Sequence, residues 1–149
     1  MKSGTRVPFI PLLLLLLIAF PLWSQDSGVD PLFFVGMKLE ELIGRYGPPR
    51  AVYAARGSES WQDDVVFEYD QGDFYIYRDR VWQVGLASAY GIALGDPKPA
   101  ALLVLGGRAE DRGNYLLFPL PDGGWPLMLR IDFSGTGLVS AIFVYRPDF

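Results

Sequence analysis

The sequence predicts an α+β fold: two tandem helix-plus-antiparallel-meander units that form a sheet with helices packed on one face. Three observations predict it. Aromatic residues make up 15% of the chain, and 17 Gly and 12 Pro favour strands and turns over long helices. Two short helical segments each lie between glycines eleven residues apart, at Gly36 and Gly47 and at Gly95 and Gly106. Each is followed by segments in which apolar residues alternate, as in half-buried strands.

The first helix is predicted within residues 36–49. Its apolar side chains fall at i, i+3, i+4 and i+7, on one face of a short helix: Leu39, Leu42, Ile43 and Tyr46. Gly47 can adopt the left-handed conformation that ends a helix, and Pro48 cannot continue one. The helix therefore has both a packing face and a defined end.

Strand-like segments follow the first helix. We expect a short strand over 51–56 and longer ones over 65–69, 74–78 and 81–86. Val65, Phe67 and Tyr69 should share one side of their strand. Asp79 and Arg80 are the expected tight connection between the last two strands. These segments and the first helix make up the first predicted repeat, residues 34–88.

The second predicted repeat covers residues 89–149. Asp96 is expected to cap its helix, with Pro97 at the first helical position. Strands are expected over 114–120, 127–133 and 138–146. The two repeats agree in the order and spacing of their elements and together should form one compact domain.

The N-terminus is read as a secretory signal peptide over residues 1–24, followed by a linker over 25–33. Lys2 and Arg6 precede an unbroken apolar run, and the small residue Ser24 could precede a cleavage point. The alternative is a transmembrane anchor, but the apolar stretch is shorter than the ~20 residues that a span needs. We therefore expect a periplasmic or secreted protein without a stable membrane anchor after cleavage.

The composition limits the classes of partner. Without residues 1–24 the chain keeps 17 acidic and 11 basic residues, a net charge of −6. Phosphate binding requires clustered Lys and Arg, so a nucleic-acid partner is not expected. The chain has no cysteine, which excludes disulfides and the lipidated cysteine of a bacterial lipoprotein. The oligomeric state is left open.

A family resemblance rests on the two helical segments. A glycine, a short helix and a closing glycine before a meander resemble the outer-membrane assembly lipoprotein BamE (SmpA/OmlA). Tandem copies of such a unit resemble the β-lactamase inhibitor protein. The matching residues are Gly36, Leu39, Leu42, Tyr46, Gly47, Pro49, Gly95, Leu102, Leu105 and Gly106. The resemblance implies an exported protein-binding module of the cell envelope without catalytic residues.

The residue types also limit the chemistry. The chain has no His and no Cys, so neither a Ser-His-Asp nor a Cys-His arrangement can form. A zinc site would lack its usual nitrogen and sulfur ligands. The adjacent Asp63 and Asp64 would point to opposite faces of a strand, which favours a solvated turn. We therefore expect no catalytic residue, no cofactor and no metal.

Strand alternation predicts an aromatic surface on the side of the sheet away from the helices. If Phe74 and Ile76 face the core, their strand neighbours face outward, and the same alternation applies to the later strands. The candidate protein-binding residues are Tyr75, Tyr77, Tyr115, Arg130, Phe143 and Tyr145. Tyr, Phe and Arg are typical of energetically important interface residues. The alternative is that a second layer covers these side chains and makes them part of the core.

These observations favour a non-enzymatic module that binds another envelope or extracellular protein. A second hypothesis is a domain that binds or hydrolyses carbohydrate or cell wall, using aromatic stacking and a pair of carboxylates. Asp132 with Asp73 or Asp64 is the candidate pair, and hydrolysis would need the two groups about 5 to 10 Å apart. A third hypothesis is a structural envelope protein without a specific ligand.

Overall fold

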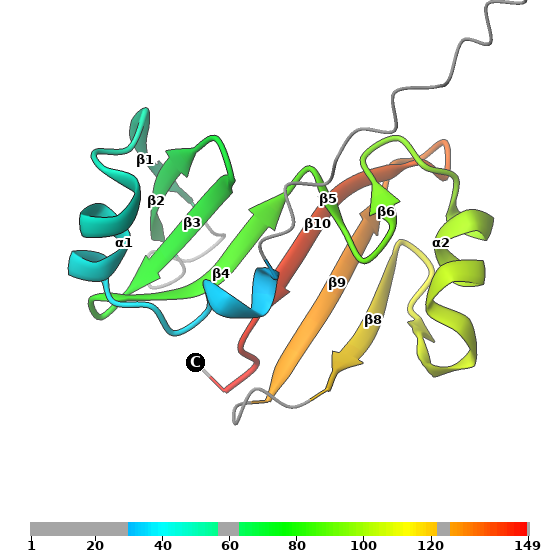
Figure 1. Ribbon diagram of the computed structural model, residues 1–149. Helices are drawn as coiled ribbons and strands as arrows, with labels where there is room; N and C mark the ends of the chain where they lie inside the picture. The colour runs from blue at the N-terminus through cyan, green and yellow to red at the C-terminus, as the bar shows by residue number, and fades with distance from the viewer. Residues whose placement is uncertain (1–29, 57–62, 122–125, 149) are drawn as a thin grey trace, which may run out of the picture.

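The computed structural model describes residues 30–56, 63–121 and 126–148, which form an α+β fold around a large antiparallel sheet (Figure 1). The predicted fold class is thereby confirmed at the level of a large sheet with two helices. The predicted signal peptide and most of the predicted linker lie outside these residues. Within them, no helix is both long enough and apolar enough to cross a membrane.

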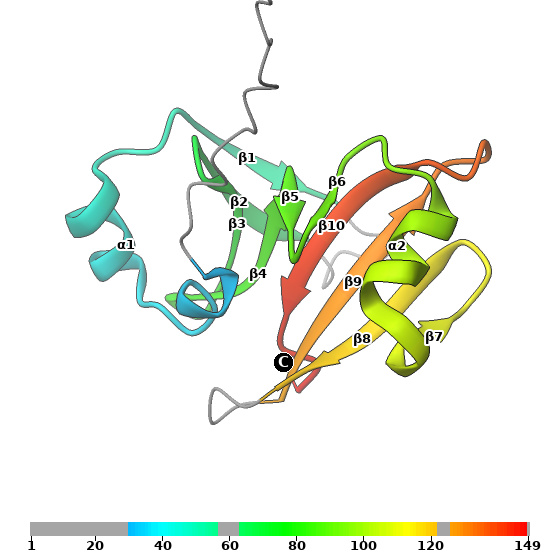
Figure 2. The same cartoon turned by 45° about the vertical axis from the view of Figure 1, so that its right-hand side comes forward.

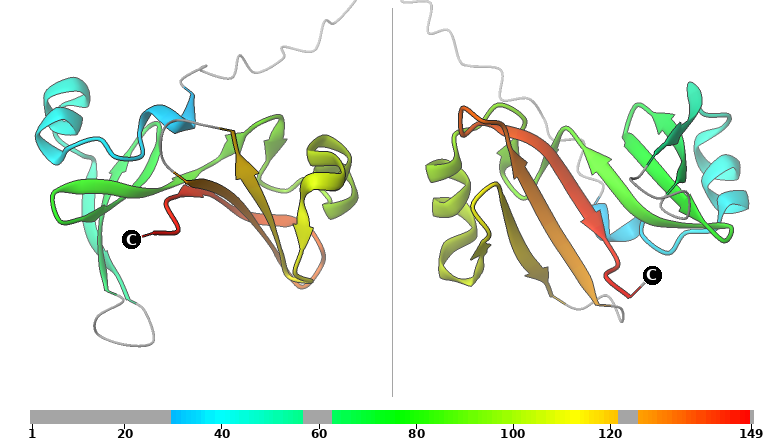
Figure 3. Two further views of the ribbon diagram at one scale, coloured as in Figure 1. Left: turned by 90° about the horizontal axis from the view of Figure 1, so that it is seen from below. Right: turned by 180° about the vertical axis from the view of Figure 1, so that it is seen from behind.

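The main sheet has eight strands in the order β1-β2-β3-β4-β10-β9-β8-β7. The strands are β1 (Ala51–Ala55), β2 (Asp64–Tyr69), β3 (Gly72–Tyr77), β4 (Arg80–Leu86), β7 (Glu110–Asp111), β8 (Tyr115–Leu120), β9 (Leu127–Phe133) and β10 (Val139–Tyr145). Every neighbouring pair is antiparallel. The contact between β4 and β10 therefore joins the first four strands to the last four. Figure 3 shows that the sheet bends strongly between its two ends.

The helical segments lie on one side of this sheet (Figure 3). They are η1 (Pro31–Phe33), α1 (Leu39–Tyr46), α2 (Lys98–Leu105) and η3 (Gly106–Arg108). Leu42 of α1 and Ala101 and Leu105 of α2 are buried in one apolar core. Figure 2 shows β7 next to α2. There the Lys98 ammonium lies 2.7 Å from the carboxylate of Asp111.

The strand side chains that complete the core were largely predictable from alternation. Leu127, Leu129 and Ile131 alternate along β9, and all three are buried. Ile142 and Val144 are also buried, and each is paired with a residue of β9 that faces the same side. The core therefore lies between the helical layer and one face of the sheet. The opposite face is called the outward face below.

One prediction about side-chain direction is wrong. Ile43 is 41% exposed, and Phe34, from the segment before α1, is buried in the core and packs edge-on against Phe74. Val65 shares the side of Phe67 and Tyr69 as predicted but is 48% exposed near the start of β2, whereas its neighbour Val66 is fully buried on the outward face. Val66 is covered because it lies between two tyrosines, Tyr53 and Tyr75, on the flanking strands.

Two predicted ends also differ. The β3–β4 turn is Arg78-Asp79, one residue earlier than expected, and both residues have positive φ (46° and 66°). Positive φ at both central residues is the geometry of the two-residue turns that match strand twist. Asp96 does not cap α2, because its carboxylate accepts a hydrogen bond from the Ala93 N–H at 2.8 Å. Pro97 occupies the capping position without a side-chain hydrogen bond.

A small hairpin between the two halves was not predicted. It consists of β5 (Ser88–Ala89) and β6 (Ile92–Ala93), joined by Tyr90 and Gly91, both of which have positive φ. Its apolar side chains, Ala89 and Ile92, are buried in the common core. Each strand is only two residues long, which is too short for a pattern of alternation to indicate it.

Candidate functional site

Four adjacent strands contribute side chains to the centre of the outward face. In one row across the sheet, Asp73 pairs with Gly85, Gly85 with Phe143, and Phe143 with Arg130. In the next row, Tyr75, Gln83 and Tyr145 are paired in the same way. Residues directly opposite each other on neighbouring strands share a face and lie in contact distance. The fold thus brings side chains as far apart in the chain as Asp73 and Tyr145 onto one surface.

An aromatic cluster forms the centre of this surface. The rings of Tyr75 and Phe143 meet edge to face, with centroids 6.1 Å apart. The Tyr75 ring also meets Trp82 at 6.4 Å. The Trp82 indole N–H donates a hydrogen bond to Asp64 Oδ1 at 3.1 Å. We call Tyr75, Trp82 and Phe143 the ring cluster; all three are partly exposed.

A second group lies on β8 and β9. The Arg130 guanidinium is 4.4 Å from the centroid of the Tyr115 ring, and Arg130 Nε donates to Asp132 Oδ1 at 2.7 Å. Tyr145 lies within electrostatic reach of this group. Burial raises the pKa of Tyr145, and the positive charge of Arg130 opposes that rise. Arg130 is therefore held in place by a ring and a carboxylate.

Five of the six predicted site residues thus fall into these two neighbouring groups. Tyr77 is different because it lies at the β3–β4 turn, where it is 42% exposed. The Arg78 guanidinium is 5.1 Å from the centroid of its ring. Tyr77 shares the face of Tyr75 by alternation, but it extends that face towards the turn and not towards β10.

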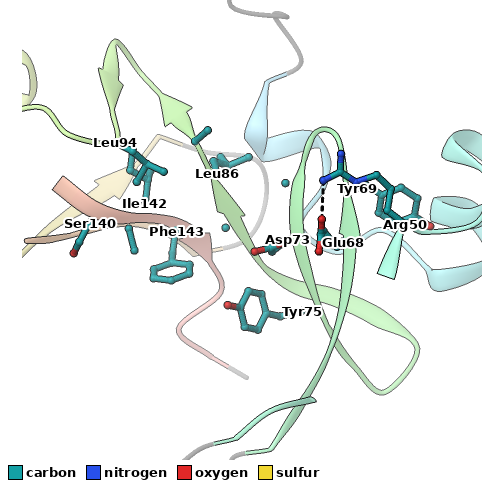
Figure 4. A pocket seen from close by; sticks show the side chains of 14 residues that line it. Arg50, Glu68, Tyr69, Asp73, Tyr75, Leu86, Leu94, Ser140, Ile142 and Phe143 are labelled. Carbon is teal, nitrogen blue, oxygen red and sulfur yellow. Dashed lines mark hydrogen bonds and ion pairs between the residues drawn. The ribbon is translucent and has the colours of Figure 1, made fainter. Parts of the chain in front are cut away.

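A hollow of about 410 Å³ adjoins the ring cluster (Figure 4). Asp73, Tyr75 and Phe143 line one part of it, and Arg50 and Glu68 line another. Gly85 also lines the hollow and has no side chain to fill it. A Cβ at this position would lie 3.4 Å from the Phe143 ring and 3.5 Å from Asp73 Cβ. A glycine inside a central strand thus leaves space between an aromatic ring and a carboxylate.

The charges around the hollow are distributed unevenly. Arg50 donates to Glu68 Oε1 at 2.6 Å and to Asp70 Oδ1 at 2.7 Å. The Tyr53 hydroxyl donates a hydrogen bond to Asp73. Burial, with the negative charge of Asp73 as the next largest cause, raises the pKa of Tyr53 to about 12. The field on this side of the hollow is therefore negative.

Sequence reasoning missed Tyr53, Trp82 and Gly85. Trp82 was not assigned to a face because a bulge opposite Tyr75 and Ile76 interrupts the alternation of β4. Its signal is the spacing of Val81 and Val84, which are both fully buried although they are three residues apart. For Gly85 the signal was a glycine inside a strand, which often marks close approach of another group.

The carboxylate pair required by the hydrolase hypothesis is not brought together. Asp132 lies on β9, three strands from Asp73 on β3 and four from Asp64 on β2. At about 4.8 Å per strand, measured along the sheet, the strands that carry these residues are roughly 14 and 19 Å apart, which does not favour the spacing that glycoside hydrolysis uses. Asp132 is also paired with Arg130. Within residues 30–56, 63–121 and 126–148, no group of three or more acidic side chains could hold a metal ion.

A comparison with a solved structure supports the fold. An extracellular protein containing an SCP domain from Bacillus anthracis str. Ames matches with a TM-score of 0.50 and 14% identity. The match covers 99% of this chain and 50% of that one, so the chain spans about half the length of its neighbour. A cysteine-rich secretory protein from Staphylococcus aureus subsp. aureus Mu50 matches with a TM-score of 0.46 and 10% identity, covering 81% and 47% of the two chains. No protein family and no curated protein matches by sequence.

The first of these matches corrects the family resemblance. The match with a TM-score of 0.50 is an extracellular protein containing an SCP domain, so the resemblance to BamE and to the β-lactamase inhibitor protein is wrong. The motif behind it reflects only how a helix ends. Gly47 and Gly106 both have positive φ and both donate a backbone hydrogen bond to a carbonyl of the last helical turn. Any short helix can end in this way, so the motif does not identify a family.

Proposed function

We propose that the chain is an exported, non-enzymatic module that binds another protein through its outward face. The observation that carries the proposal is the ring cluster of Tyr75, Trp82 and Phe143, which is partly exposed beside a hollow of about 410 Å³. Aromatic anchors that fill or border pockets supply most of the binding energy in many interfaces. Nucleophilic catalysis by a Ser-His-Asp or Cys-His arrangement cannot contribute, because the sequence contains neither His nor Cys.

The rest of the outward face supports the same proposal. Tyr115, Arg130 and Tyr145 are partly exposed and lie two strands or fewer from Phe143. Tyr and Arg are enriched at interfaces because they combine a large contact surface with a hydrogen-bonding group. Arg130 is already oriented by Tyr115 and Asp132, so its ordering on binding would cost little side-chain entropy.

We further propose that the fold arose from two tandem helix-plus-meander units. The support is the sheet order, in which β1 to β4 and β7 to β10 meet through their last strands. An eight-residue helix that ends at a positive-φ glycine precedes each set. In this arrangement the ring cluster draws on both units, since Tyr75 and Trp82 come from the first and Phe143 from the second.

Export is proposed from the N-terminal sequence and the setting of a structural neighbour. The basic residues and apolar run of residues 1–24 are typical of a signal peptide. The Bacillus anthracis protein of similar fold is described as extracellular. The proposed location is therefore the periplasm or the cell exterior, with a soluble mature protein whose partner is another envelope or extracellular protein.

The test compares face variants with a matched control on the helical side. A partner is first recovered by cross-linking from a cell-surface extract, purified, and titrated calorimetrically against Tyr75→Ala, Phe143→Ala and Tyr90→Ala. Tyr90 is 38% exposed in the β5–β6 turn, outside the outward face. We expect each face variant to lose about 2 kcal/mol of binding free energy or more. Tyr90→Ala should bind like the unchanged protein.

Two outcomes would contradict the proposal. Equal binding by all three variants would remove the outward face as the interface. Failure to recover any protein, together with binding to purified cell wall that Tyr75→Ala abolishes, would favour the carbohydrate-binding hypothesis instead. Circular dichroism of each variant establishes that a loss of binding does not result from unfolding.

A further inference from the structure

The hollow beside the ring cluster has an acidic side chain, Asp73, that forms no ion pair with a Lys or Arg in the described part of the chain. Glu68, on the opposite strand, differs because Arg50 lies 2.6 Å away. Tyr53 donates a hydrogen bond to Asp73, but its hydroxyl is uncharged and leaves the negative charge of Asp73 in place. Asp73 is partly buried, so solvent screens this charge less than on an open surface.

Neighbouring groups respond to the same negative field. Burial raises the pKa of Tyr75, and the charges of Asp73 and then Asp64 raise it further. Asp64 accepts its hydrogen bond from the neutral Trp82 indole and likewise has no ion pair among the described residues. Because Arg50 is engaged by Glu68 and Asp70, its charge is largely offset. The ring-cluster side of the hollow would therefore stabilise a cation.

The walls beside Asp73 are aromatic. The rings of Tyr75 and Phe143 stand at 83° to each other, so a group that lies beside the pair can meet the face of one ring and the edge of the other. Gly85 opens the space between the Phe143 ring and Asp73, since it presents no side chain there. Figure 4 shows Asp73, Tyr75 and Phe143 near one another, with Glu68 beside Asp73 and Arg50 next to Glu68.

We propose that this hollow receives the side chain of an arginine from the partner protein. The inference rests on the proposed function and specifies the chemistry of its partner. A guanidinium is planar, remains charged, and can stack on an aromatic face while it donates two hydrogen bonds to a carboxylate. Asp73 supplies the carboxylate, and Tyr75 and Phe143 supply the aromatic surface. A volume of about 410 Å³ accommodates such a side chain together with part of its backbone.

The test uses ¹⁵N-labelled protein recovered from an exporting host. Nα-acetyl-arginine amide is the probe, and Nα-acetyl-citrulline amide is its uncharged match of nearly identical shape. Both are titrated while ¹H–¹⁵N correlation spectra are recorded. We expect the arginine derivative to shift the Tyr75 and Gly85 amides saturably. The affinity for the citrulline derivative should be lower by about tenfold or more, because this derivative lacks the charge that pairs with Asp73.

Variants identify the groups responsible. Asp73→Asn should weaken binding of the arginine derivative about tenfold. Gly85→Ala should weaken it as well, because the added methyl group enters the hollow between Phe143 and Asp73. Glu41→Gln on α1 is the control, because it removes a carboxylate outside the hollow. The affinity of this variant for the arginine derivative should equal that of the unchanged protein. If the spectrum of Asp73→Asn shows an unfolded protein, the affinity of Gly85→Ala for the arginine derivative becomes the decisive measurement.

Three results would overturn the inference: no saturable shifts, equal binding of the two derivatives, or undiminished binding by the decisive variant. Failure of the inference is separable from failure of the proposed function. If Tyr75→Ala abolishes binding to the purified partner but the arginine derivative does not enter the hollow, only the arginine anchor is wrong. If the derivative binds but Tyr75→Ala leaves partner binding intact, the hollow is a cation site and the outward face is not the interface.

Discussion

The rings of Tyr75 and Phe143 meet edge to face at 6.1 Å, although they belong to β3 and β10, which are separated by β4. They can meet because the residue of β4 opposite Phe143 is Gly85, which presents no side chain between them. This contact joins the first four strands to the last four on the outward face. It also makes the shape of that face depend on a glycine.

The first prediction concerns Gly85 and Gly72, which lie on adjacent strands. Gly85→Ala should leave the free energy of unfolding within about 1 kcal/mol, because the new Cβ makes ordinary contacts and an alanine restricts the unfolded chain. Gly72→Ala should lower it by more than about 1 kcal/mol. Gly72 has φ +148°, and a Cβ there would clash with the Gly85 carbonyl oxygen. Urea denaturation of both variants measures the difference.

The two glycine variants also separate folding from binding. Gly85→Ala should fold normally while it narrows the hollow, whereas Gly72→Ala should reduce stability. If both variants lose the same stability, the backbone at Gly85 is as restricted as that at Gly72, and the space beside Phe143 is not set by the missing side chain alone.

A second prediction distinguishes surface tyrosines from core residues. Tyr77→Ala should change the free energy of unfolding by about 0.5 kcal/mol or less, because Tyr77 is 42% exposed. Leu42→Ala should cost about 2 to 5 kcal/mol, because Leu42 is fully buried. Tyr75→Ala should fall between them, since Tyr75 is partly buried against Trp82 and Phe143. Thermal melting of the three variants measures this order.

The position of Tyr75 in that order decides between two views of the outward face. Melting as early as Leu42→Ala would mean that the Tyr75 ring belongs to a core, as the alternative to a binding face requires. If Tyr75→Ala melts at nearly the same temperature as Tyr77→Ala, the Tyr75 ring is mainly a surface group and contributes little to the stability of the core. Either result is read against the unchanged protein at the same concentration.

The fold class and most strands could be predicted because apolar alternation directly reflects a buried face. Leu127, Leu129 and Ile131 alternate without interruption, and their strand begins and ends where expected. Alternation failed in β4, where a bulge shifts the register after Val81. A bulge depends on pairing with another strand, so a single segment does not indicate it.

The candidate site was only partly predictable for a related reason. Tyr75 and Phe143 could be assigned to one face by alternation, but their contact depends on the strand order, which places β10 beside β4. No local pattern specifies that order. The hollow depends on Gly85 and Tyr53 as well, and these residues become part of a site only once their neighbours on other strands are known.

The third prediction concerns export. In a host with a general secretion pathway, we expect the recovered protein to begin near Gln25 and to remain in solution without detergent. The physical reason is the short apolar run followed by the small residue Ser24. Mass spectrometry of the secreted or periplasmic fraction measures the N-terminus. Intact residues 1–24 on membrane-bound protein would establish an anchor and exclude cleavage.

The fourth prediction uses the pH dependence of Asp64. Burial raises the pKa of Asp64 above its ordinary 3.8 and the charge of Asp63 raises it further, while the Trp82 hydrogen bond acts in the opposite direction. A raised pKa means that the folded protein holds this proton more tightly than the unfolded chain. The ionised group therefore opposes folding at pH 7, and this cost disappears as the pH falls through the folded pKa towards 3.8.

Asp64→Asn tests that sign, because asparagine keeps an acceptor for the Trp82 indole and removes the charge. The variant should be at least as stable as the unchanged protein at pH 7, and its advantage should shrink as the pH falls towards 3.8 and be absent below that pH. Asp111→Asn is the opposite control: hydrogen bonds from Lys98 and Gly113 lower the pKa of Asp111. Its charge therefore favours folding above pH 3.8, so this variant should be less stable at pH 7 and the difference should close on acidification. Urea denaturation across this range measures both, and a loss of stability in Asp64→Asn at pH 7 would mean that the hydrogen bond from Trp82 outweighs burial.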